Sequence, residues 1–243
     1  MKPRSDLLTF RCALTLAALL FTAGCRRTAP ISDAPARVVA FGDSITRGYN
    51  LPVGAVWVDV LAARWERAGR PIAVYNAGGN GNTSTEGRRR LNSEVLIHLP
   101  GLVLVEFGGN DAVEGERHVT VDDFDRNLTA IHEAVTARGG RTVLLTFPPV
   151  IDDWHSAGRS PYYLQRGGLD REVELYRQRT REVAARLGVP LFDLDHFLRD
   201  LIKARGPEAY IHRDGVHLTP EGNRVVAEAV KNFLVTEELI TAR

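Results

Sequence analysis

Cysteine is almost absent from this sequence of 243 residues, and its two copies, Cys12 and Cys25, both lie near the start. The rest of the chain therefore has no thiol, which excludes a disulfide framework, a cysteine nucleophile or a thiolate metal site there. An excess of charge of either sign is also missing, because 31 basic side chains oppose 30 acidic ones. This balance gives no electrostatic reason to expect a nucleic-acid partner.

The chain begins with an apolar run that is too short to span a bilayer. The run covers residues 13–23 and follows three basic residues, Lys2, Arg4 and Arg11. A spanning helix needs roughly 20 apolar residues. A basic segment, a short apolar run and small residues after it are typical of a secretory signal. We therefore predict that residues 1–24 are a signal peptide.

The end of this leader resembles a bacterial lipobox, the motif in which a cysteine is lipidated and becomes the new N-terminus. Thr22-Ala23-Gly24-Cys25 has the small residues and the cysteine, although threonine stands where leucine is usual. The resemblance implies a lipid anchor on Cys25 in the bacterial cell envelope, facing the periplasm. The alternative is ordinary cleavage, which gives a soluble periplasmic or secreted protein. Residues 25–36 contain two prolines and no apolar period, so we predict a flexible tether.

Residues 37–243 alternate short apolar runs with segments of helical periodicity, and their number suits one compact domain. Five runs are predicted to be buried strands, because they are β-branched or aliphatic with little polar alternation. They are Val38–Phe41, Ile72–Asn76, Leu102–Phe107, Thr142–Phe147 and Pro190–Phe192. Alternating strands and helices predict an α/β protein, a three-layer α/β/α sandwich around a mostly parallel five-stranded sheet.

Three of the intervening segments carry clear helical signals. Residues 57–68 and 124–135 repeat large apolar side chains at helical spacing. Thr219-Pro220 predicts a helix start, with threonine as the N-cap and proline at the first helical position. This last helix is expected to bury Val225, Ala229, Val230 and Phe233.

One long stretch, residues 148–168, has no clear periodicity and contains several aromatic residues. A loop of that length in a compact domain is usually a lid or a binding wall. We expect it to form a wall of the functional site, because exposed aromatic side chains would be unfavourable in a merely solvated loop. The alternative is a mobile surface excursion.

Four short polar islands carry the chemistry of the chain. They are Gly42-Asp43-Ser44-Ile45-Thr46, Gly79-Asn80-Gly81-Asn82-Thr83, Gly108-Gly109-Asn110-Asp111 and Asp214-Gly215-Val216-His217. The first three follow predicted strands, so they are expected at the carboxyl edge of the sheet, where ligands bind in such folds. Together they supply a serine, a glycine, an asparagine and an Asp/His pair, which are the parts that acyl transfer needs.

Asp214 and His217 are predicted to act as an orienting carboxylate and a general base. Their spacing lets the carboxylate hold the imidazole Nδ1–H while Nε2 faces a serine hydroxyl. His212 is the rival base, because it lies two residues before the aspartate. The remaining histidines are scattered and are interpreted as surface or packing residues. They are His98, His118, His132, His155 and His196.

The order and the amino-acid sequences of the four islands resemble the motifs of the SGNH (GDSL) hydrolase family of esterases, lipases and acyl hydrolases. The likeness extends from about residue 37 to residue 234, and Asp-Gly-Val-His-Leu-Thr-Pro matches the last motif of the family almost letter for letter. The family fold is the flavodoxin-like α/β/α sandwich predicted above. The resemblance implies that Ser44 is the nucleophile, that His217 is its base and that Asp214 orients the base.

The resemblance also implies an oxyanion hole made by the backbone N–H groups of Ser44 and Gly81 and the side-chain amide of Asn110. Gly79 is a competing assignment, because three glycines crowd this loop. Two aspartates flank these residues. We expect Asp43 to brace the serine turn and Asp111 to brace the loop after the asparagine.

The implied function is hydrolysis of acyl esters, with thioesters and lysophospholipids as related substrates, and it requires no cofactor. One alternative is a carbohydrate O-deacetylase of the cell envelope, and another is a non-catalytic envelope lipoprotein that uses the fold as a binding module. A metal-dependent phosphoesterase built on Asp43, Asp111, Asp214 and His217 is disfavoured. Its usual motifs, Asp-x-His after the first strand and Gly-Asn-His, do not occur.

Overall fold

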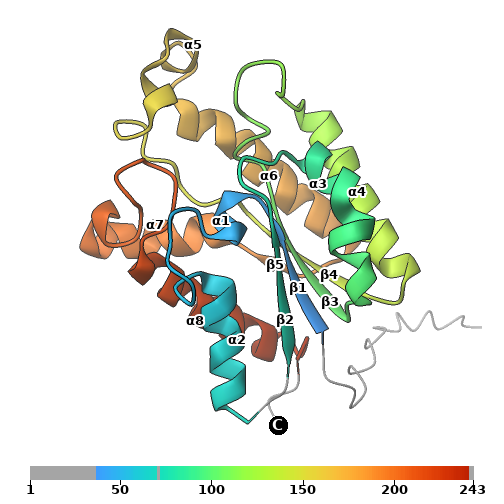
Figure 1. Cartoon of the computed structure of the whole chain (residues 1–243). Helices are drawn as coiled ribbons and strands as arrows, with labels where there is room; N and C mark the ends of the chain where they lie inside the picture. Colours follow the sequence, from blue (N-terminus) through green and yellow to red (C-terminus); the bar gives the residue numbers. More distant parts are fainter. Residues whose placement is uncertain (1–36, 70–71, 241–243) are drawn as a thin grey trace, which may run out of the picture.

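A computed structural model describes residues 37–69 and 72–240 as a three-layer α/β/α sandwich (Figure 1). Five parallel strands form one sheet in the order β2-β1-β3-β4-β5. They are β1 (Arg37–Gly42), β2 (Ala73–Gly78), β3 (Leu102–Glu106), β4 (Arg141–Leu145) and β5 (Leu191–Phe192). All five predicted strands are confirmed, with ends that differ by at most two residues.

Helices cover both faces of the sheet, which explains why the strands carry little polar alternation (Figure 1). One face carries α2 (Trp57–Arg67), α7 (Leu194–Arg205) and α8 (Pro220–Thr236). The other carries α3 (Ser84–Glu94), α4 (Val121–Ala137) and α6 (Leu169–Leu187). The connections contain α1 (Ser44–Arg47), α5 (Pro161–Leu164) and the 3-10 helices η1 (Leu96–His98), η2 (Ser156–Arg159) and η3 (Pro207–Ala209). The three predicted helical segments are confirmed.

Helix α8 begins as predicted but buries a different stripe. Thr219 caps it by accepting a hydrogen bond from the Gly222 N–H, and proline is its first residue. Of the four residues predicted to be buried, only Val230 is fully so. The buried stripe includes Val226 and Leu234, spaced four residues apart on either side of Val230, where the helix packs against α2. An apolar pattern that extends around both flanks does not specify which flank faces the neighbouring helix.

The stretch 148–168 is not irregular throughout, because it contains η2 and α5. Its start is fixed by Arg177 of α6, whose side chain is fully buried. The guanidinium donates to the carbonyl oxygens of Phe147 at 3.0 Å and Pro148 at 2.7 Å, and it pairs with Asp170 at 2.7 Å. A buried charge is tolerated only with such complete partners. These bonds hold the beginning of the stretch against the end of β4.

The predicted signal peptide, the lipidation site Cys25 and the predicted tether lie outside the described residues. The described chain starts at Arg37, at the amino end of β1, whereas Ser44 follows its carboxyl end. Within residues 37–69 and 72–240, no helix combines the length and apolar character needed to cross a membrane.

Candidate functional site

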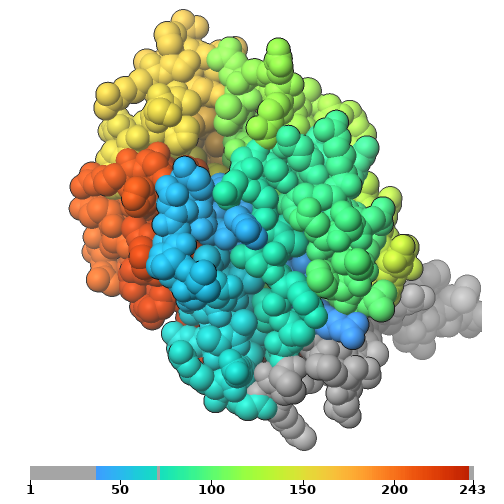
Figure 2. Space-filling view, in the orientation of Figure 1, coloured from blue at the N-terminus to red at the C-terminus, as the bar shows by residue number. Residues whose placement is uncertain are grey.

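The four motif islands meet at the carboxyl edge of the sheet, where the strand order changes direction. β1 leads to Ser44 and β3 to Asn110, on the two sides of this switch point, and β2 leads to Gly81. Crossovers leave a crevice at such a point. A pocket of about 200 Å³ lies here and is lined by these three residues and His217, among others. Figure 2 shows the blue segment after β1 directly against the orange-red segment that precedes α8.

A tight turn presents Ser44 to this pocket. The carboxylate of Asp43 caps α1 by accepting a hydrogen bond from the Ile45 N–H at 2.9 Å, so Asp43 braces the turn as predicted. The residue before it must be a glycine for steric reasons. A Cβ on Gly42 would lie 2.6 Å from the Glu106 carbonyl oxygen, closer than real side chains approach. Ser44 is therefore the first residue of the helix, with its hydroxyl free to face the pocket.

Ser44, His217 and Asp214 form one continuous hydrogen-bonded chain. His217 Nε2 lies 2.9 Å from the Ser44 hydroxyl oxygen, and its Nδ1 lies 2.8 Å from Asp214 Oδ2. Partial burial acts to raise the pKa of Asp214, but hydrogen bonds from the backbone N–H groups of His217 and Val216 outweigh it and lower that pKa to about 2. The aspartate is therefore a carboxylate at neutral pH.

The rival base, His212, has a different environment. Its Nδ1 lies 3.3 Å from Asp214 Oδ2, and its side chain is 62% exposed. Its backbone N–H donates to the carbonyl oxygen of His217 at 2.7 Å, which helps to hold the loop. His217 is instead packed under Tyr49, whose ring centroid lies 4.5 Å from the imidazole. The geometry thus brings His217 to the serine, and it leaves His212 at the rim.

Gly81 and Gly79, the two candidates for the backbone donor, have different environments in the loop after β2. Gly81 lines the pocket and has a φ of +68°, which favours glycine. The backbone N–H of Gly79 already donates to the Gly42 carbonyl oxygen at 3.0 Å. Only Gly81 of these two is therefore placed to offer its N–H to a ligand.

An arginine that sequence analysis did not single out fixes this loop. Arg90 of α3 donates to the carbonyl oxygens of Gly42 at 2.7 Å and Ala77 at 2.6 Å, and to Asn82 Oδ1 at 2.7 Å. One guanidinium thus connects the ends of β1 and β2 to the loop that carries Gly81. In the sequence, Arg90 is one of three adjacent arginines and does not stand out from them. The carbonyl groups of Gly42 and Ala77 come together only in the folded chain, so no local pattern indicates that Arg90 binds them.

Asn110 lines the pocket, and its side-chain amide already donates two hydrogen bonds. Its Nδ2 donates to Asp43 Oδ2 at 2.9 Å and to the Asn82 carbonyl oxygen at 3.1 Å. The amide therefore bridges the loops after β1, β2 and β3. The adjacent Gly109 lies flat on the ring of Phe147, and a Cβ there would come within 2.6 Å of a ring carbon.

Three buried acidic side chains lie behind the pocket. Burial raises the pKa of Glu106 well above its usual range and raises the pKa of Asp43 to about 7. The nearby charge of Asp43 also raises the pKa of Glu106, and the charge of Asp111 raises that of Asp43, because like charges in a buried site repel each other. Glu106 accepts a hydrogen bond from Thr46 at 3.0 Å. The pair therefore retains a proton near neutral pH, directly behind the serine turn.

The third buried acid, Asp111, has a role beyond the predicted one. Its carboxylate is stabilised by backbone hydrogen bonds from Gly108 and Asp111 in its own loop. It also accepts a hydrogen bond from the backbone N–H of Ser84 at 3.0 Å, so it anchors the start of α3. Burial raises its pKa to about 6. The sequence placed it beside Asn110 but gave no sign of the α3 terminus that folds onto it.

The carboxylates of Asp43, Asp111 and Asp214 each accept a hydrogen bond from a backbone N–H group. Within the described part of the chain, the acidic and histidine cluster with metal-ligand spacing is Asp193, Asp195 and His196, before and at the start of α7. Its two carboxylates already pair with arginines. Arg181 lies 2.8 Å from Asp193, and Arg199 lies 2.8 Å from Asp195.

The stretch 148–168 contributes Val150 and His155 to the pocket, so the predicted wall is confirmed. The aromatic residues on which that prediction rested do not line the pocket. Trp154 is covered by the guanidinium of Arg213 at 4.3 Å, and Tyr163 is buried. His155 lies outside the four motifs, so its sequence context indicates only a surface or packing residue.

A model of the GDSL-like lipase/acylhydrolase family matches residues 40–225, a span that includes all four motif islands. The chain belongs to this family. Members share the fold described above and hydrolyse acyl esters, and this GDSL hydrolase is a carboxylic-ester hydrolase.

Several relatives match most of this GDSL hydrolase. An uncharacterized lipoprotein of Bacillus subtilis (strain 168), YqeF, is 33% identical over 220 residues, which cover 80% of this chain and 88% of that protein. An arylesterase of Vibrio mimicus is 26% identical, over 84% of this chain and 90% of its own length. The crystal structure of a lipase/acylhydrolase from Enterococcus faecalis has a TM-score of 0.68 at 28% identity and covers 83% of this chain and 96% of that one.

Proposed function

We propose that this GDSL hydrolase is a serine esterase with Ser44, His217 and Asp214 as its catalytic triad. The continuous contacts from hydroxyl to imidazole to carboxylate, at 2.9 and 2.8 Å, carry this proposal. The serine oxygen bonds to the ester carbonyl carbon while His217 takes the hydroxyl proton. His217 then gives this proton to the departing alkoxide. A water molecule hydrolyses the acyl-enzyme by the same route, and Asp214 stabilises the imidazolium in both steps.

The negative oxygen of each tetrahedral intermediate needs preorganised donors. We propose the backbone N–H groups of Ser44 and Gly81 and the amide of Asn110, each worth about 3–4 kcal/mol in the transition state. An amide nitrogen has only two hydrogens to donate. Asn110 would therefore exchange its bond to the Asn82 carbonyl oxygen for one to the oxyanion, while Asp43 keeps the amide oriented.

The pocket favours a small ester with a short acyl group. Its volume of about 200 Å³ is below the roughly 300–1,000 Å³ of sites that hold drug-sized ligands. Much of its lining is apolar, from Val113, Phe147, Val150, Leu169 and Val173. We therefore propose esters of acetate and similar short acids as substrates, in preference to long-chain lysophospholipids or acyl thioesters. An acetylated carbohydrate meets the same condition.

Covalent labelling distinguishes this enzyme from a binding module with the same fold. A fluorophosphonate probe is expected to phosphorylate Ser44 stoichiometrically, because the reagent reports only on a serine activated by its base. Mass spectrometry of the tryptic peptide identifies the labelled residue. The Ser156→Ala variant, which changes an exposed serine of η2, is expected to label like the wild type. Folded protein that takes up no label would favour the binding module.

We also propose that the mature protein is held at the cell-envelope membrane by a lipid on Cys25 and faces the periplasm. The lipobox-like sequence supports this location, as does the relative named as a lipoprotein. The described chain begins at the amino end of β1, and the pocket lies beyond the carboxyl ends of the strands.

Replacement of the proposed lipidation site is expected to change the location of the protein but not its chemistry. Cys25→Ser should move the protein from the membrane fraction to the soluble fraction, because the acyl chains that provide the anchor are no longer attached. Mass spectrometry of the wild type should identify an N-terminal diacyl- or triacyl-glyceryl cysteine. An unmodified N-terminus beyond residue 25 would contradict the anchor and leave the esterase proposal intact.

A further inference from the structure

His155 is a pocket residue whose free nitrogen can be identified from its contacts. Its Nδ1 accepts a hydrogen bond from the backbone N–H of Ala157 at 3.2 Å. Burial lowers the pKa of the imidazole, which keeps the ring neutral. A neutral imidazole has one acceptor and one donor nitrogen, so the proton must lie on Nε2. Within residues 37–69 and 72–240, no side chain or backbone group accepts a hydrogen bond from that Nε2.

The backbone around His155 is fixed to the loop that carries Asp214 and His217. Gly215 has a φ of +83°, and a Cβ there would lie 2.7 Å from the backbone nitrogen of His155 and 3.0 Å from its Cβ. The Ile151 N–H donates to the Gly215 carbonyl oxygen at 2.8 Å. His155 therefore enters the pocket close to Asp214 and His217, whose charges also act on its imidazole.

This position corresponds to the alcohol side of an ester. The leaving oxygen receives its proton from His217, so the alcohol group must depart on the side of the pocket where His217 lies. Two apolar side chains that line the same pocket, Val150 and Val216, offer no acceptor to a neighbouring N–H donor. A substrate that leaves such a donor unpaired binds less well than one that satisfies it.

We propose that His155 is a specificity-determining residue, which donates a hydrogen bond from Nε2 to an oxygen atom in the alcohol part of the ester. The inference rests on the proposed esterase function and narrows its substrate class. It predicts a preference for short acyl esters of alkoxy or polyhydroxy alcohols, such as glycol, glycerol or sugar esters, over esters of plain alkyl alcohols. Such alcohols place an ether or hydroxyl oxygen a few atoms from the ester oxygen.

Two nearly isosteric substrates test this hydrogen bond. 2-Methoxyethyl acetate and butyl acetate have the same acyl group and the same chain length, and they differ by one oxygen in place of a methylene. The wild type is expected to have the higher kcat/KM for 2-methoxyethyl acetate. His155→Phe keeps a ring but removes the donor, and it should lower the ratio of the two kcat/KM values about tenfold. His155→Gln retains an N–H donor and should keep most of the preference.

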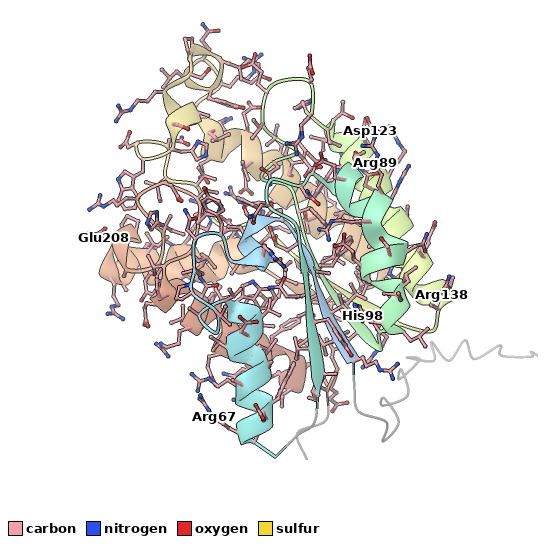
Figure 3. The ribbon with its side chains drawn as sticks, in the orientation of Figure 1. Arg67, Arg89, His98, Asp123, Arg138 and Glu208 are labelled. Atoms are coloured by element: carbon pink, nitrogen blue, oxygen red, sulfur yellow. The ribbon has the colours of Figure 1, made fainter. Side chains whose placement is uncertain are left out.

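A matched control changes a histidine at the other end of the sheet. His98 stacks on Tyr75 with 4.0 Å between ring centroids, and Figure 3 shows it far from α1. His98→Phe should leave the substrate ratio unchanged. An equal fall of kcat/KM for both acetates in His155→Phe would mean that His155 only supports the loop, and unchanged kcat/KM values for both would mean that it has no role. Either result overturns the inference. A wild type inactive on both acetates would instead overturn the esterase proposal itself.

Discussion

Ser44→Ala is expected to reduce p-nitrophenyl acetate hydrolysis by roughly 10⁴- to 10⁶-fold, because loss of a triad member removes the covalent route altogether. The side chain contributes little to the fold. Its hydroxyl contacts His217 at 2.9 Å, whereas Asp43, rather than Ser44, caps α1. Steady-state kinetics on the purified variant measure the loss.

The thermal unfolding midpoint of Ser44→Ala should stay close to that of the wild type, which separates lost chemistry from lost structure. Ser156→Ala serves as the matched control and should retain full turnover, since this serine lies in η2 and does not line the pocket. A Ser44→Ala variant that keeps more than about a tenth of the wild-type rate would exclude this serine as the nucleophile.

The second large effect concerns the base. His217 must be neutral to take the serine proton, so kcat/KM should rise with pH over the range in which this imidazole loses its proton. Asp214, with a pKa of about 2, stays ionised throughout that range and adds no limb of its own. His217→Ala should remove both the ascending limb and nearly all turnover. A pH–rate profile of each variant measures this.

Three further variants test whether the rise of kcat/KM with pH is due to His217. His212→Ala should keep both the limb and the turnover, and Asp214→Asn should stay folded but lose most activity, because an amide can hold the wrong imidazole tautomer. Burial raises the pKa of Asp43 to about 7, so this carboxyl group also titrates near neutral pH. Glu106→Gln alters the buried neighbour of Asp43 but not His217, and it should therefore leave the ascending limb in place. An inactive His212 variant beside an active His217 variant would reassign the base.

The buried pair of Asp43 and Glu106 illustrates a feature that sequence reasoning missed. Glu106 is the last residue of β3 and looks like an ordinary polar strand end. It becomes a buried neighbour of Asp43 only because β3 pairs with β1, in a register that sets Glu106 opposite Gly42. Register of this kind depends on contacts between residues that are far apart in sequence, so no local pattern specifies it.

The fold class could be predicted from the sequence alone. Buried strands covered on both faces and amphipathic helices differ in the spacing of their apolar residues. The sequence also determined which residues are candidates for catalysis, because Ser44, Asn110 and the Asp-x-x-His pair lie in short motifs whose residue types match acyl transfer. Local signals sufficed for both.

The tertiary structure was needed to distinguish between competing candidate residues and to identify the residues that support the site. It places His217, rather than His212, against the serine, and it places Gly81 in the pocket lining while the N–H of Gly79 bonds to Gly42. It also gave Arg90 its place across two strand ends and His155 its place in the pocket. These roles depend on distances between segments tens of residues apart. Such distances are fixed by strand register and helix packing, which no local stretch of sequence encodes.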